Sequence, residues 1–188
     1  MHLPADGSVP AQLDLFTPTT PQEETALQGM RRLLAASSAA DQAFDRVLVG
    51  EPEWWGHFTG SAWIVNAQRD RVVLVHHVKL GKWLQPGGHC EGEMDVREVA
   101  KREAQEETGL IILAPQEGIF DVDVHAIPQW RDIPAHWHYD LRYLFTADEA
   151  SPLAVSHESH NVVWASLEQA EQLNAEESIV RMVRKTRE

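Results

Sequence analysis

The most constraining feature of this sequence is the stretch "GGHCEGEMDVREVAKREAQEETGL", residues 87–110. It begins with two adjacent glycines and continues into a predicted helix over residues 95–108, where Asp95 and Glu98 have the spacing of a capping box. Gly109 follows, as expected where a helix stops in the left-handed region. Positions i, i+3 and i+4 of this helix share one face, and here they carry three carboxylates: Glu103, Glu106 and Glu107.

Three like charges on one helix face need something that offsets their repulsion. Solvent can do so, and most acidic helix faces are only solvated surfaces. A divalent cation can also do so, because hard oxygen ligands in a small cluster suit Mg²⁺ or Mn²⁺. The surroundings favour the cation: a glycine turn feeds the helix from a strand, Arg102 stands directly before the carboxylates, and Gly109 closes the segment.

Runs of alternating or continuous apolar residues predict strands on both sides of this helix. Two precede it, at residues 57–67 and 71–78, and a short strand within residues 80–88 then runs into a glycine turn. Four follow it, at residues 110–114, 119–127, 136–147 and 160–166. Further helices are predicted from Thr20 or Thr25 through Phe44, and at residues 166–173 and 176–187. This order predicts an α/β fold in which a mixed sheet is sandwiched between helices.

The chain of 188 residues suits one main domain with an extension. The prolines among residues 1–22 predict a flexible N-terminal arm, residues 23–50 a helical extension, and residues 55–188 the main domain.

Composition narrows the classes of function. The formal net charge of −13 argues against a non-specific binder of nucleic acid or membranes, which would carry a basic patch. The single cysteine, Cys90, excludes an intramolecular disulfide. The first residues lack the pattern of a secretory signal, and no segment has the roughly 18 apolar residues of a membrane span. We therefore expect a soluble cytoplasmic protein.

Residues 88–110 resemble the Nudix box, whose pattern is G-x5-E-x7-R-E-U-x-E-E-x-G-U with U aliphatic. Eight of its nine defined positions match in register when Ala104 counts as U: Gly88, Arg102, Glu103, Ala104, Glu106, Glu107, Gly109 and Leu110. A motif of this length seldom arises by chance. The resemblance implies a Nudix fold over about residues 55–188.

One position departs from the pattern, because the first glutamate of the box falls on Met94. Glu93 is adjacent, and we hypothesise that a slip of one residue in the loop lets it take the vacant role. In the family this glutamate is mostly a supporting residue, so the departure affects rate more than fold.

The resemblance implies a hydrolase that cleaves the diphosphate linkage of a nucleoside diphosphate joined to another group, by in-line attack of water at phosphorus. Glu103, Glu106 and Glu107 would hold one to three Mg²⁺ or Mn²⁺ ions, with Arg102 orienting them. The base that takes the proton from water stays open between Glu106, Glu103 and the downstream Glu158, which is otherwise an exposed loop residue. Gly87 and Gly88 would let the backbone approach a small-molecule nucleotide derivative.

Other side chains are candidate substrate contacts. His89 follows the double glycine, and His136, His138 and Asp140 alternate along one strand, so they share a face. Trp130 lies in a loop and could stack on a base. Trp63 and Trp83 lie inside strands, where core packing is the better interpretation.

Two other classes compete with hydrolysis. An isopentenyl diphosphate isomerase of the same fold would need a cysteine on a separate strand, whereas Cys90 lies in the box loop. A non-catalytic Nudix-fold sensor of nucleotide derivatives is favoured only by Met94. The sequence leaves the substrate open, and a homodimer formed through the N-terminal helix is compatible with it.

Overall fold

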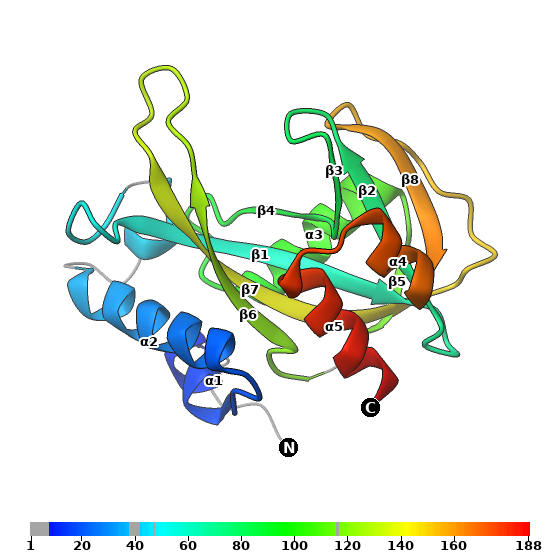
Figure 1. Ribbon diagram of the computed structural model, residues 1–188, viewed down its shortest axis with the longest axis horizontal. Helices are drawn as coiled ribbons and strands as arrows, with labels where there is room; N and C mark the ends of the chain where they lie inside the picture. Colours follow the sequence, from blue (N-terminus) through cyan, green and yellow to red (C-terminus); the bar gives the residue numbers. More distant parts are fainter. Residues whose placement is uncertain (1–7, 38–41, 47, 116) are drawn as a thin grey trace. The chain divides into compact units, whose positions relative to one another are not determined.

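The computed structural model describes residues 8–37, 42–46, 48–115 and 117–188 (Figure 1). These residues form two compact units. Unit 1 comprises the described parts of Met1–Gly60, Gly88–Val99 and Glu117–Arg142. Unit 2 comprises Ser61–Gly87, Tyr143–Glu188 and the described part of Ala100–Gln116.

Unit 1 begins with helices α1 (Val9–Leu15) and α2 (Pro21–Ala36) and the 3-10 turn η1 (Gln42–Phe44), drawn in blue to cyan in Figure 1. We expected an irregular arm up to residue 22, but α1 forms within it because Val9 and Leu13 are buried and α1 packs against α2. Residues 1–7 of the predicted arm lie outside the described residues. The division into arm, extension and domain stays a prediction.

Helix α2 begins with a capping box formed by Thr20 and Glu23. The Thr20 hydroxyl accepts a hydrogen bond from the Glu23 N–H at 3.2 Å, and the Glu23 carboxylate accepts one from the Thr20 N–H at 3.1 Å. Two of the donors that a helix start leaves unpaired are thereby satisfied. We had expected this helix to continue through Phe44, but it ends at Ala36.

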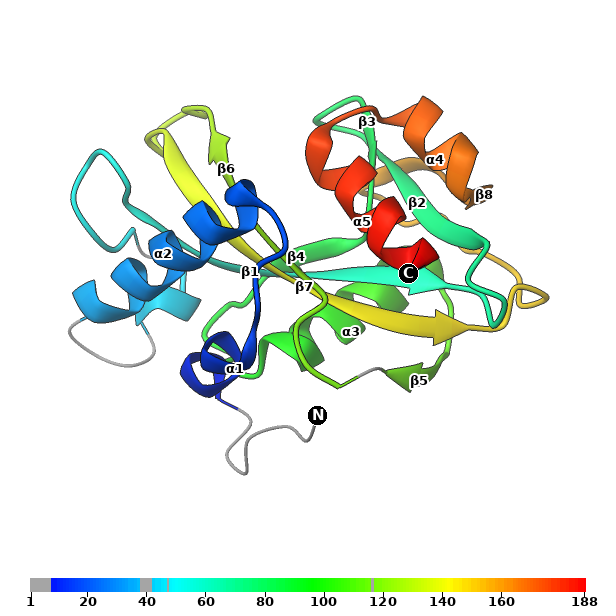
Figure 2. The same cartoon turned by 60° about the horizontal axis from the view of Figure 1, so that its bottom comes forward.

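The strands of unit 1 are β6 (Asp121–Ile127) and the first parts of β7 (His136–Ala147) and β1 (Gly56–Val65), with β4 (Gly87–His89) pairing with β1. β6 runs antiparallel to β7, β1 is the neighbour of β7 in the sheet, and α2 packs on β6 (Figure 2). Gly56 is required at the start of β1, because a Cβ there would lie 1.9 Å from the Trp137 carbonyl oxygen.

Unit 2 is built around β2 (Arg71–His77), which pairs antiparallel with β8 (Ser159–Ser166), with β3 (Lys82–Leu84) and with the end of β1. β5 (Ile112–Pro115) pairs with the end of β7. Helices α4 (Leu167–Leu173) and α5 (Glu177–Arg187) lie side by side, and α4 packs on β2 and β8 (Figures 1 and 2). Trp63 is fully buried and its indole N–H donates to the Thr186 hydroxyl at 2.8 Å, so it is a core residue as predicted.

Helix α3 (Val96–Thr108) is the predicted carboxylate helix. The Asp95 carboxylate accepts a hydrogen bond from the Glu98 N–H at 3.2 Å, which caps the helix start. The helix ends at Gly109, whose φ of +70° lies in the left-handed region.

The predicted strands and helices from residue 57 onward are confirmed, and β3 is the short strand predicted within residues 80–88. The two glycines that were predicted to form a turn begin β4 instead. No helix among the described residues is long and apolar enough to cross a membrane. The cytoplasmic location stays a prediction from the sequence.

The end of α3 yields a stability prediction. A Cβ at Gly109 would lie 2.7 Å from the Ala154 Cβ, so we expect Gly109→Ala to lower the free energy of unfolding by about 2–4 kcal/mol through backbone strain and steric overlap. Gly81 has a similar φ of +61° and open space around it. We expect Gly81→Ala to cost only about 1–2 kcal/mol in urea unfolding. Equal losses in the two variants would contradict the packing of Ala154 against the helix end.

Candidate functional site

In unit 2, Gly87 at the start of β4 is connected to the carboxylate face of α3 by one hydrogen bond. The Gly87 N–H donates to Oε1 of Glu107 at 3.0 Å, and Glu107 is 6% exposed. A buried carboxylate that meets a backbone donor is held in place, so this contact fixes one of the three predicted metal ligands.

The surroundings of Glu107 disfavour its negative charge. Burial raises its pKa to about 7 together with the charges of Glu103, Glu158 and Glu106, although the hydrogen bond from Gly87 opposes the shift. Burial also raises the pKa of Glu103, although the contact with Arg102 opposes this shift. The Arg102 guanidinium donates to the Glu103 carboxylate at 3.2 Å. A cation would relieve the repulsion that these carboxylates feel.

Two further candidates extend the cluster. Glu106 is exposed, and Glu158 is exposed in the loop before β8, where its backbone carbonyl accepts a hydrogen bond from the Val78 N–H at 2.9 Å. The charge of Glu158 acts on both Glu103 and Glu107. The structure therefore brings the predicted base candidates of unit 2 into one electrostatic neighbourhood, and their roles stay predictions.

In unit 1, the loop before α3 holds the residue proposed to replace the missing box glutamate. The exposed Glu93 carboxylate accepts a hydrogen bond from the Asp95 N–H at 2.9 Å, directly before the helix. Met94 is 44% exposed, and Cys90 is buried. Glu93 thus supports the loop backbone, while its part in activity stays a prediction.

The β6–β7 pairing of unit 1 gathers polar side chains on one face. The register pairs Asp121 with Arg142, Asp123 with Asp140, and His125 with His138. Because alternate residues of a strand share a face, these three pairs line one side of the hairpin. The polar residues that alternate along β7 therefore lie opposite polar residues of β6 on the same face.

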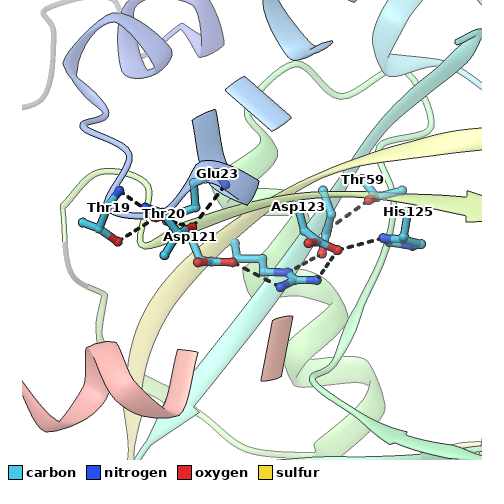
Figure 3. Close-up of polar contacts among 9 residues, drawn as sticks. Thr19, Thr20, Glu23, Thr59, Asp121, Asp123 and His125 are labelled. Atoms are coloured by element: carbon cyan, nitrogen blue, oxygen red, sulfur yellow. Dashed lines mark hydrogen bonds and ion pairs between the residues drawn. The ribbon is translucent and has the colours of Figure 1, made fainter. Parts of the chain in front are cut away.

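Arg142 is the centre of this polar face. Figure 3 shows its partners Asp121 and Asp123 together with Thr59 and His125. Its guanidinium donates to Asp140 at 2.8 Å and to Asp121 and Asp123 at 3.1 Å each, and its side chain is 3% exposed. Burial alone lowers the pKa of Arg142, but the three carboxylates outweigh it and raise the pKa above its ordinary value. The Thr59 hydroxyl of β1 donates to Asp140 at 3.0 Å, which connects β1 to the same network.

Next to this network lies a group of imidazoles. His57, His89 and His138 each bring a ring nitrogen to within 4.8 Å of the others. Burial lowers the pKa of His57 to about 3, with His89 and His136 adding to the effect, and burial also lowers the pKa of His138. In the described part of the chain, the carboxylates of Glu103, Glu106 and Glu107 do not all come this close to one another.

Sequence analysis predicted three of these histidines as substrate contacts but did not predict His57 or His125. His89, His136 and His138 lie together as a cluster, and His57 and His125 join them with ring centroids 4.9 and 5.4 Å from that of His138. His57 and Thr59 alternate at the start of β1 as His138 and Asp140 do in β7, and this repeated spacing was the available signal. Trp130 lies at the tip of the β6–β7 hairpin and is 65% exposed.

Comparison with known proteins identifies the family. The model of the NUDIX domain matches residues 57–185. A relative from Bacillus subtilis (strain 168), the uncharacterized Nudix hydrolase YvcI, is 36% identical over 66 residues, which are 32% of this chain and 42% of the relative. The chain thus matches less than half of that relative's length. The chain belongs to the Nudix family.

Solved structures agree with this assignment. A NUDIX-family hydrolase from Clostridium perfringens is 28% identical with a TM-score of 0.51, covering 70% of this chain and 96% of its own. The Ap4A hydrolase of C. elegans, solved as a binary complex, has a TM-score of 0.54 at 19% identity and covers 68% of this chain and 93% of its own. The predicted fold class, an α/β Nudix fold, is confirmed.

The polar face of unit 1 yields the second prediction. Arg142→Met would leave buried carboxylates without their cation, so we expect a loss of about 3–5 kcal/mol in the free energy of unfolding. The matched control is Arg71→Met, since Arg71 pairs with Glu149 at 3.1 Å while 46% exposed, and we expect it to cost less than about 1 kcal/mol. A loss at Arg142 no larger than that at Arg71 would contradict a structural role for the buried network.

Proposed function

We propose that the chain is a metal-dependent hydrolase that cleaves the diphosphate linkage of a nucleoside diphosphate joined to another group. The proposal rests on family membership and on the intact carboxylate segment of α3. The single observation that carries it is Glu107, which is buried, accepts a hydrogen bond from Gly87 and has a pKa raised to about 7 beside other carboxylates. A buried carboxylate with a raised pKa does not stabilise the fold, so its presence favours a functional role for Glu107.

The donor set of α3 fits Mg²⁺ or Mn²⁺. Glu103, Glu106 and Glu107 supply hard carboxylate oxygens, and the Gly87 contact engages only one of the two oxygens of Glu107. One to three bound ions would neutralise the charge that builds on the phosphate oxygens. We propose these three glutamates as the ligands.

The remaining groups act on water and on orientation. Arg102 holds Glu103 through a charge-assisted hydrogen bond. Glu106, Glu103 or Glu158 would accept the proton of the attacking water. Gly87 and Gly88 carry no side chain, so the backbone can approach an anionic substrate.

We propose a small-molecule nucleotide derivative as the substrate, rather than duplex nucleic acid or a membrane surface. Trp130 supports this proposal as an exposed ring available for stacking on a base. His89, His136 and His138 remain predicted contacts of the substrate. A homodimer also remains a proposal.

The third prediction tests hydrolysis directly. We expect metal-dependent release of phosphate-containing products from at least one member of a panel of nucleoside diphosphate derivatives, assayed separately with Mg²⁺ and Mn²⁺. Glu107→Gln keeps the side-chain shape but removes the charge that the ion needs. We expect it to lower kcat/KM by about 100-fold or more, equivalent to roughly 3 kcal/mol of transition-state stabilisation.

The matched control for this assay is Glu98→Gln, which changes an exposed glutamate on the first turn of the same helix. We expect its activity to equal that of the wild type. Tight binding of a nucleotide derivative with no turnover of any panel member would overturn the hydrolase proposal in favour of a sensor in which Met94 marks a disabled site.

The fourth prediction concerns the altered loop. If Glu93 replaces the box glutamate, Glu93→Gln will lower kcat by about 10-fold, and Met94→Glu in the same chain will restore part of it. Steady-state kinetics of the single and double variants measure both effects. Unchanged activity in Glu93→Gln would show that the slip of one residue does not occur.

A further inference from the structure

Three histidines from separate segments of unit 1 converge on one point. We call His57 of β1, His89 of β4 and His138 of β7 the imidazole cluster. One ring nitrogen of each lies within 4.8 Å of those of the other two. Such convergence of three imidazole donors is the arrangement by which proteins hold nitrogen-preferring metal ions.

Two members of the imidazole cluster have buried nitrogens that no described residue satisfies. Neither Nδ1 nor Nε2 of His57, nor Nε2 of His138, has a hydrogen-bond partner. A buried polar atom without a partner costs about 1–3 kcal/mol, and native proteins contain few of them. One bound cation would satisfy a nitrogen of His57 and one of His138 at the same time.

The spacing of the rings matches a shared ion. Three imidazoles on one tetrahedral ion, with metal–nitrogen distances of about 2.0–2.1 Å, have ring centres roughly 5 Å apart. The observed centroid separations are 5.1 Å between His57 and His89, 4.9 Å between His57 and His138, and 5.0 Å between His89 and His138. The rings are tilted against one another by 46–89°, which is unlike a parallel stack.

We propose that the imidazole cluster binds one divalent transition-metal ion, with Zn²⁺ the best match. Mg²⁺ and Mn²⁺ prefer oxygen ligands, so this site differs in selectivity from the carboxylates of α3. Three protein ligands leave one tetrahedral position for water or for an anionic oxygen such as that of a phosphate. His89 and His138 would then contact substrate through the ion.

Two histidines beside the imidazole cluster, His125 and His136, are oriented by contacts of their own. Nδ1 of His136 lies 2.9 Å from the Pro134 carbonyl oxygen, which only accepts, so Nδ1 carries the proton. Nδ1 of His125 lies 3.3 Å from the Asp123 carboxylate, which Arg142 also contacts. Hydrogen bonds of this kind orient the rings around metal sites. The buried network of Arg142 is therefore coupled to the imidazole cluster through His125.

The proposal does not require diphosphate hydrolysis, and the test measures binding alone. The chelator-treated full chain is titrated with Zn²⁺ in excess Mg²⁺ by calorimetry, and with Co²⁺ by visible absorption. We expect one Zn²⁺ ion per chain and the intense Co²⁺ bands of a four-coordinate site with three nitrogen ligands. In His89→Gln and His138→Gln, we expect the affinity to fall by more than about 100-fold, since even a lost supporting residue weakens metal binding about 10–100-fold.

Two controls separate this site from other histidines and from the carboxylates. His76 and His160 form another pair, with ring centroids 5.4 Å apart, and His76→Gln should leave Zn²⁺ affinity unchanged. Glu103→Gln combined with Glu107→Gln should also leave it unchanged. Thermal unfolding of each apo variant verifies that the chain is folded.

Three outcomes would overturn the proposal. The first is that the wild type binds no more Zn²⁺ than His89→Gln. The second is that His76→Gln loses as much affinity as His89→Gln. The third is that Zn²⁺ binding disappears with the two glutamates, which would place the ion on α3.

Discussion

The guanidinium of Arg142, buried among three aspartates, is the interaction on which the polar face of unit 1 depends. It contacts Asp121 and Asp123 of β6 and Asp140 of its own strand. A slip of one residue in β6 would turn its carboxylates to the other side of the sheet and leave the buried charge unpaired, so the network selects one register. That register sets His125 opposite His138, and the Thr59–Asp140 hydrogen bond connects β1, which carries His57. The register that the Arg142 network selects therefore sets the positions of His125 and His138.

The carboxylates of α3 and the imidazole cluster share a physical property. Each gathers groups that lower stability in the apo chain: like charges around the buried Glu107, and imidazole nitrogens without partners at His57 and His138. Local rules are commonly broken in this way at functional sites, where the stability lost is offset when the ligand binds. The chemistry of the two donor sets differs, because oxygen ligands suit hard ions and imidazoles suit transition metals. The two proposed sites would therefore differ in the kind of cation that each prefers.

Much of the fold follows from local sequence signals. The caps at Thr20 and Asp95, the glycine after α3 and the alternation in β7 each depend on residues close in the chain, and the structure agrees with all of them. The carboxylate face was equally predictable, because helical spacing brings Glu103 and Glu107 together. The ion pairs of Arg142 with Asp121 and Asp123 could not be predicted, because alternation tells which residues share a face but not which strands pair. His57 was not predicted for the same reason. Helix α1 was not predicted because it depends on burial of Val9 and Leu13 against α2.

We expect the chain to hold hard cations at the carboxylates of α3 and transition metals at the imidazole cluster. The most direct measurement is anomalous X-ray scattering from crystals of the full chain soaked with Mn²⁺ and Zn²⁺ together, recorded at the absorption edge of each metal. We predict a Mn²⁺ peak at Glu103, Glu106 and Glu107 and a Zn²⁺ peak at His57, His89 and His138. Both metals at one position, or no Mn²⁺ peak at the glutamates, would contradict it.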